Sequence, residues 1–164
     1  MKLNKIEKEI QSALQSFVPM ALKHDLSDRQ WTLDIKEIIG NIGKDKNFEI
    51  CTSSHPGRFL TEWLYDLIWY EADEDGHITE LKLIYESEWA LSLDAIWYDF
   101  EKLLVGKCSQ KLMFFQARSN KIEKYFDLMV ASISTFKPVI VGERYFLIAY
   151  DLDQRQFKYR LRVN

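Results

Sequence analysis

The sequence has little of several residue types that mark particular classes of protein. It has only two cysteines, Cys51 and Cys108, which lie far apart and have no CxxC partner. Neither a zinc site nor a disulfide framework is therefore indicated, and both cysteines are expected to be buried free thiols. The three histidines, His24, His55 and His77, are isolated and match no metal-binding spacing. A glycine-rich phosphate-binding loop is also missing.

Long apolar runs and an excess of basic residues are missing as well. No apolar run approaches the ~20 residues that a membrane span needs. The charged amino-terminal segment lacks the apolar core of a signal peptide, so we expect a cytoplasmic protein with no membrane partner. The net charge is −3, whereas proteins that hold nucleic acid mainly by its phosphates are more often basic. A late basic cluster is either a local basic edge or a solvated edge strand, and it consists of Arg144, Arg155, Lys158, Arg160 and Arg162.

The remaining composition is that of a globular domain. Hydrophobic residues make up 47% of the chain and charged residues 29%, which is an ordinary balance for a folded protein. A length of 164 residues fits a single domain over 1–164 and is enough to bury a core. We find no internal repeat, low-complexity tract or linker.

Hydrophobic periodicity predicts the order of the secondary-structure elements. Apolar stripes at helical spacing predict helices over about 6–21, 30–40, 93–104 and 119–133. Alternating or continuously apolar runs predict strands over 48–52, 66–72, 78–89, 111–117, 145–150 and 156–163. A hairpin followed by crossover helices is typical of an α/β (α+β) fold in which helices flank a central mixed β-sheet.

Three carboxylates fall together on the hairpin formed by the strands 66–72 and 78–89. With the turn centred on Asp75, facing residue numbers sum to about 150, so Asp66 lies opposite Ile84. Asp66, Glu86 and Glu88 then share one face at the end of the hairpin away from the turn. Because three carboxylates on one face repel each other, a divalent cation with oxygen ligands, Mg²⁺ or Mn²⁺, is their natural partner. The alternative is that these strand ends are simply solvated.

This arrangement resembles the PD-(D/E)XK, or restriction-endonuclease-like, nuclease superfamily. The resemblance covers 61–117: Asp66 on one strand, Glu86-Ser-Glu88 on the next, then a helix and an apolar strand. It implies a restriction-endonuclease-like core with Asp66 and Glu86 as metal ligands. Glu88 stands where the catalytic lysine of the superfamily is usual, and the resemblance implies that Lys102 on the following helix supplies it. Lys102 is otherwise an ordinary surface lysine that pairs with Asp99.

Two neighbouring features compete with this assignment or extend it. Glu80-Leu-Lys82 also has the Glu-x-Lys pattern, but Glu80 would face Tyr70, roughly 13 Å along the strand from Asp66 and too far to share one ion. Glu62 is a further candidate acid at the edge of the site.

Two classes of function follow from the residues and the resemblance. The first is a metal-dependent nuclease-like protein that hydrolyses phosphodiester bonds in DNA or RNA. The second is a non-catalytic protein-binding module, such as a toxin-immunity or antitoxin-like protein, whose acidic groups steer a basic protein partner.

Overall fold

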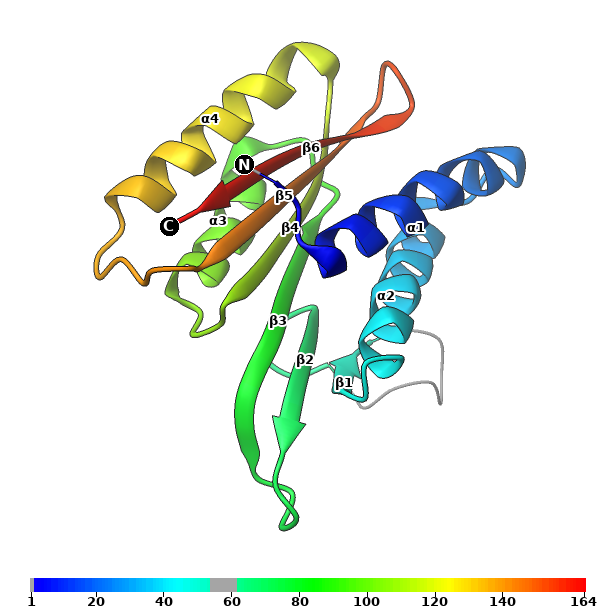
Figure 1. The fold of residues 1–164 in the computed structure, drawn as a ribbon. Coiled ribbons are helices and arrows are strands. Elements are labelled where there is room, and N and C mark those ends of the chain that lie inside the picture. The colour runs from blue at the N-terminus through cyan, green and yellow to red at the C-terminus, as the bar shows by residue number, and fades with distance from the viewer. Residues whose placement is uncertain (1, 54–61) are drawn as a thin grey trace. The chain divides into compact units, whose positions relative to one another are not determined.

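The protein has an α/β fold in which four helices accompany a six-stranded mixed sheet, as the sequence predicts. The structure is a computed structural model and describes residues 2–53 and 62–164. Its helices are α1 (Lys5–Lys23), α2 (Asp28–Lys44), α3 (Leu93–Val105) and α4 (Ser119–Thr135) (Figure 1). Its strands are β1 (Glu49–Thr52), β2 (Leu67–Ala72), β3 (Ile78–Glu88), β4 (Gln110–Ala117), β5 (Arg144–Asp151) and β6 (Gln156–Val163).

The sheet is mixed and its strands follow the order of the sequence. The strand order is β1-β2-β3-β4-β5-β6. β1 pairs with β2 in antiparallel fashion, β4 with β5 in parallel, and β5 with β6 in antiparallel fashion. The chain crosses from β4 to β5 through α4, since two parallel neighbouring strands need a crossover connection. The last strand, β6, lies at an edge of the sheet, as its basic residues predict.

The chain divides into two compact units. The amino-terminal unit spans Lys2–Ile84 and the carboxy-terminal unit spans Tyr85–Asn164. The single domain expected over 1–164 stays a prediction. In the described part of the chain, none of the helices has both the length and the apolar character needed to cross a membrane.

In the amino-terminal unit, α1 packs against α2. A capping box begins α1, in which Asn4 accepts from the Glu7 N–H and the Glu7 carboxylate accepts from the Asn4 N–H. The helix contains Pro19 and continues to Lys23. Its buried apolar stripe meets α2 where the rings of Phe17 and Trp31 lie edge to face, 5.0 Å apart.

α2 is longer than its apolar stripe predicts, and its close packing explains why. Two glycines suggest an end near residue 40, yet the helix runs from the Ser27 cap to Lys44. A Cβ atom at Gly43 would lie 2.6 Å from the side chains of both Ile50 and Trp69. A glycine in this last turn therefore lets the helix backbone approach β1 and β2 closely.

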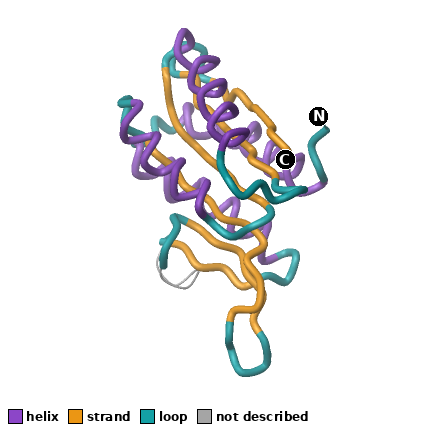
Figure 2. Tube along the Cα trace, turned by 90° about the vertical axis from the view of Figure 1, so that its left-hand side faces the viewer, coloured by secondary structure: helices purple, strands orange, loops and turns teal. Residues whose placement is uncertain are grey.

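The hairpin of β2 and β3 closes at the predicted turn. The Asp73 N–H donates to the His77 carbonyl at 3.0 Å, which matches the predicted register around Asp75. Gly76 has φ +83°, a conformation that side chains with a Cβ rarely adopt. The two strands lead directly into the loop at their tip (Figure 2).

In the carboxy-terminal unit, α3 packs on β4, and α4 packs on β5 and β6. Ser92 caps α3 and Gly106 follows its last residue. α4 has no such cap from its own N-cap residue, Arg118. Instead, the Asp153 carboxylate in the β5–β6 turn accepts from the Ser119 N–H at 2.9 Å.

A second carboxylate of the β5–β6 turn is almost completely buried. Asp151, which is 1% exposed, accepts from the Ser119 hydroxyl at 2.6 Å and from the N–H groups of Asp153 and Gln154 at 3.0 Å. Burial alone would raise the pKa of Asp151, but these hydrogen bonds outweigh it and lower the pKa below its ordinary value. The turn and the start of α4 are thereby fixed to each other.

A closed triangle of polar groups lies in the core of the same unit. Lys111 Nζ is 2.8 Å from Glu143 Oε1 and 2.9 Å from the Tyr145 hydroxyl, which in turn lies 3.0 Å from Glu143 Oε2. All three residues are at most 5% exposed. Because each polar group is hydrogen-bonded, the triangle is tolerated among apolar side chains.

Candidate functional site

The carboxylate of Glu86 is buried and paired with Lys102. Glu86 lies on β3 and is 1% exposed, and Lys102 Nζ on α3 lies 2.7 Å from its Oε1 atom. The same Nζ atom lies 3.2 Å from Asp99 Oδ1. The structure therefore brings together the two residues that the resemblance links, and it also contains the ordinary pairing with Asp99.

Lys102 is held in its charged form. Burial by itself would lower the pKa of Lys102, but the hydrogen bond and attraction of Glu86, together with Asp99, raise the pKa above its ordinary value. An ammonium with a raised pKa is a poor proton acceptor near neutral pH, whereas it stabilises a nearby negative charge well.

Glu88 is half-buried at the end of β3 and accepts a local hydrogen bond. Its Oε1 atom lies 2.7 Å from the N–H of Ala90, two residues along the chain. This bond orients the carboxylate where the chain leaves the strand.

Asp66 lies directly before β2 and is held by a lysine that the sequence reading did not single out. Lys36 Nζ, from α2, lies 3.1 Å from Asp66 Oδ1, 3.0 Å from Glu62 Oε2 and 3.3 Å from Ser53 Oγ. Ser53 Oγ also donates to Glu62 Oε2. The backbone carbonyl of Asp66 accepts from the Thr52 hydroxyl at 2.7 Å, which ties β1 to the start of β2.

These contacts assemble two acid–lysine clusters, one in each compact unit. Asp66, Glu62 and Lys36 belong to the amino-terminal unit, and Glu86 and Lys102 to the carboxy-terminal unit. The ion shared by Asp66 and Glu86 stays a prediction.

The donor chemistry of the predicted ligands fits a hard divalent cation. Asp66 and Glu86 offer carboxylate oxygens, which are the ligands that Mg²⁺ and Mn²⁺ prefer. Each of the two carboxylates already has a lysine ammonium within about 3 Å. Such an ion would therefore have to share these oxygens with the lysines.

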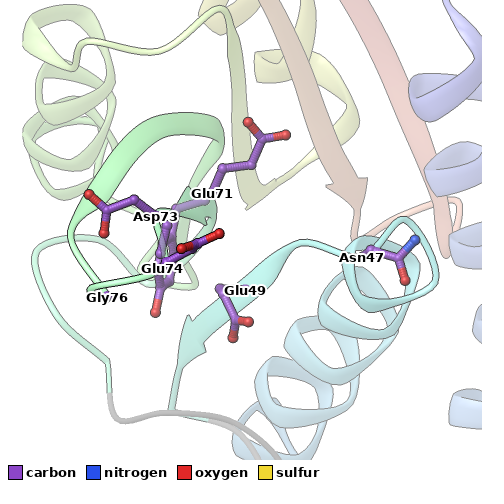
Figure 3. Close-up of a pocket in the computed structure, with 8 residues that line it drawn as sticks. Asn47, Glu49, Glu71, Asp73, Glu74 and Gly76 are labelled. Carbon is purple, nitrogen blue, oxygen red and sulfur yellow. The ribbon is translucent and has the colours of Figure 1, made fainter.

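An acidic hollow lies on the amino-terminal unit, between β1 and the β2–β3 hairpin. It has a volume of about 370 Å³ and is lined by Asn47, Glu49, Tyr70, Glu71, Ala72, Asp73, Glu74 and Gly76. Figure 3 shows that Glu49 comes from β1, while Glu71, Asp73 and Glu74 come from the hairpin. Lys82 lies 3.2 Å from Glu71 and neutralises part of this charge. The hollow still carries an excess of carboxylates, so it favours basic groups.

The turn at the tip of the hairpin contains a small exposed group of possible ligands. Within residues 2–53 and 62–164, Asp73, Asp75 and His77 each offer one atom within 4.8 Å of the others. Asp73 Oδ1 accepts from the N–H groups of Asp75 and His77, at 3.1 and 2.8 Å. These hydrogen bonds account for the cluster as turn chemistry.

One residue of the basic cluster, Arg160 on β6, is engaged within its own unit. Arg160 forms ion pairs with Glu123 and Asp127 on α4, at 2.5 and 3.1 Å. Its guanidinium also lies 5.5 Å from the ring centre of Phe126. This arginine therefore covers α4, which weakens the interpretation of β6 as a basic edge for nucleic acid.

The sequence does contain a signal for Lys36. The buried positions of α2 include Trp31, Ile35 and Ile39, and Lys36 falls within this stripe. A lysine on the buried side of an amphipathic helix needs an acidic partner, because an unpaired buried charge is costly. The identity of that partner is not readable, since Asp66 is 30 residues away.

Comparisons with known proteins give no relative from which a function can be transferred. No protein-family model matches the chain, and no curated protein or solved structure is significantly similar to it.

Proposed function

We propose that this chain is a metal-dependent nuclease-like protein that hydrolyses phosphodiester bonds in DNA or RNA. The observation that carries the proposal is the pair formed by Glu86 on β3 and Lys102 on α3, with 2.7 Å between their charged atoms. The resemblance to PD-(D/E)XK nucleases lacks a lysine at Glu88, and Lys102 supplies an ammonium next to the second acidic residue. The order of hairpin, helix and strand agrees with the same resemblance.

Each residue has a distinct role in this proposal. Asp66 and Glu86 would hold Mg²⁺ or Mn²⁺, which when bound activates water and stabilises charge on a phosphodiester. Lys102 would stabilise negative charge on the scissile phosphate, because its raised pKa keeps it protonated. Glu88 would help to position the metal or the water.

Divalent-dependent cleavage of single- and double-stranded DNA and RNA tests the proposal. Asp66→Ala, Glu86→Gln and Lys102→Met should each lower the cleavage rate by at least about a hundredfold, since a metal ligand or a charge at the phosphate contributes several kcal/mol to the barrier. Cleavage that is equal in wild type and Asp66→Ala would refute the proposal.

The double variant Glu80→Gln/Lys82→Met is the matched control. It removes the same residue types from the same hairpin, where Lys82 pairs with Glu80 at 2.6 Å near the surface. Cleavage should persist in this variant. Loss of cleavage here, with activity retained in Asp66→Ala, would instead assign the site to the Glu80-Leu-Lys82 motif.

A second function is favoured by the acidic hollow: binding of a basic protein, as an immunity or antitoxin-like protein does. Its lining includes Glu49, Glu71, Asp73 and Glu74, which would attract a basic surface. A partner that co-purifies with the wild type should be lost from Glu49→Gln/Glu74→Gln and retained by Glu123→Gln, which removes an exposed acid of α4. Equal retention by all three proteins would exclude the hollow as the binding surface.

A further inference from the structure

Lys36 is more buried than the lysines of the described chain that pair with acids near the surface. Its side chain is 5% exposed, and its ammonium contacts three oxygen atoms from three side chains, those of Ser53, Glu62 and Asp66. An ammonium has three N–H donors, so these contacts can use all of them. Since the contacts reach 17 to 30 residues along the chain, they depend on the tertiary fold.

The two carboxylates lie nearer to solvent than the ammonium does. The side chains of Glu62 and Asp66 are 37% and 21% exposed. An ion that arrives from solvent therefore meets carboxylates first. One ammonium and two carboxylates leave the cluster with a net charge of −1, which attracts cations and repels phosphate.

The geometry also limits how far apart the two carboxylates are. The contacting oxygens of Glu62 and Asp66 each lie about 3 Å from the same nitrogen, so they are at most about 6 Å apart. A divalent cation with oxygen ligands at 2.0–2.6 Å would take a similar place between two such carboxylates. Lys36 thus stands in for a cation at this position.

We propose that Lys36 is an internal counter-ion for the metal ligand Asp66. Its ammonium offsets one of the two negative charges of Asp66 and Glu62 when no divalent cation is bound, and it lowers the affinity of these carboxylates for such a cation. The inference rests on the proposed function, because it takes Asp66 to be a metal ligand. It adds a residue outside the hairpin that sets how readily the site is filled.

Removal of the positive charge should strengthen cation binding. A divalent ion bound at these carboxylates would lie within roughly 5 Å of the Lys36 ammonium, and their repulsion is appreciable even at the dielectric constant of water. We therefore expect Lys36→Met to bind Mn²⁺ at least about tenfold more tightly than the wild type at pH 8. Lys36→Arg keeps the charge and should bind Mn²⁺ no more tightly than the wild type. If Lys36 had a purely structural role, its removal would weaken Mn²⁺ binding, because its loss would disorder the carboxylates.

The experiment is Mn²⁺ titration of the full chain, with free Mn²⁺ measured by electron paramagnetic resonance and folding checked by circular dichroism. Lys36→Gln repeats the test with a neutral hydrogen-bond donor in case Lys36→Met does not fold. Tighter binding by the neutral variants, abolished in Lys36→Gln/Asp66→Asn, supports the inference. Unchanged or weaker binding by the neutral variants overturns it.

The same titration separates this inference from the proposed function. If the wild type binds Mn²⁺ through Asp66 and the neutral variants do not bind more tightly, the counter-ion role is wrong and the metal ligand stands. If Asp66→Asn binds Mn²⁺ as the wild type does, or neither the wild type nor the neutral variants bind it, then Asp66 is not a metal ligand and both fail.

Discussion

The substitution Lys111→Met removes the positive charge from the buried triangle of Lys111, Glu143 and Tyr145. Lys111 and Glu143 lie 2.8 Å apart, and their side chains are 1% and 6% exposed. Their attraction at an effective dielectric constant of about 20 is roughly 6 kcal/mol, much of which the desolvation of both charges offsets. The substitution leaves the Glu143 carboxylate buried without its cation, although the Tyr145 hydroxyl still donates to it. Removal of one partner from a buried pair costs about 3–5 kcal/mol, a large part of the stability of a typical domain.

Urea denaturation followed by circular dichroism and tryptophan fluorescence measures this cost. The double variant Lys111→Met/Glu143→Gln removes both charges and should be less destabilised than the sum of the single variants. Lys82→Met, at a half-buried lysine with surface partners, is the control and should change the free energy of unfolding by less than about 1 kcal/mol. A cost below about 1 kcal/mol for Lys111→Met, or strict additivity in the double variant, would refute the role of the triangle.

Three further perturbations test other parts of the fold. Gly43→Ala should destabilise by about 1–3 kcal/mol in urea despite the higher helix propensity of alanine, because its Cβ would lie 2.6 Å from Ile50 and Trp69; a stabilised variant would contradict the packing. Asp151→Asn should cost about 1.5–3 kcal/mol at pH 7. The stability from the lowered pKa of Asp151 is present above the ordinary aspartate pKa and is lost as the pH falls through the folded pKa, so the difference should shrink on acidification; a difference that stays constant from about pH 7 to pH 2 would refute the charge effect. Burial, with Glu143 nearby, raises the pKa of Tyr145. The stability that comes from this raised pKa is therefore complete below about pH 10, the ordinary tyrosine pKa, and is lost as the pH rises further. Tyr145→Phe should accordingly lose less stability than the wild type between about pH 9 and 11.

Much of the fold is predictable because it depends on local chemistry. The apolar stripes and alternating strands place all of the described elements in their correct order. Ser27 and Ser92 mark helix starts because a hydroxyl next to an apolar stripe satisfies free N–H groups. The turn at Gly76 follows from the backbone conformation that glycine permits.

The length of α2 and the cap of α4 have tertiary causes. The glycines of α2 suggest an end near residue 40, but Gly43 serves close packing on Ile50 and Trp69. α4 begins at Ser119 with a cap from Asp153, which lies 34 residues away. Neither fact can be read locally, because each depends on a segment that only folding brings near.

For the candidate site, the sequence by itself determined which acids stand at the ends of the two strands. Asp66, Glu86 and Glu88 follow from the strand period and the turn, and Lys102 follows from the resemblance. Only the tertiary structure decided that Glu86 is buried beside Lys102, and that Lys36 holds Asp66 and Glu62. The physical reason is that periodicity specifies the face on which a residue lies, whereas the partner of a buried charge depends on which distant segment packs against that face.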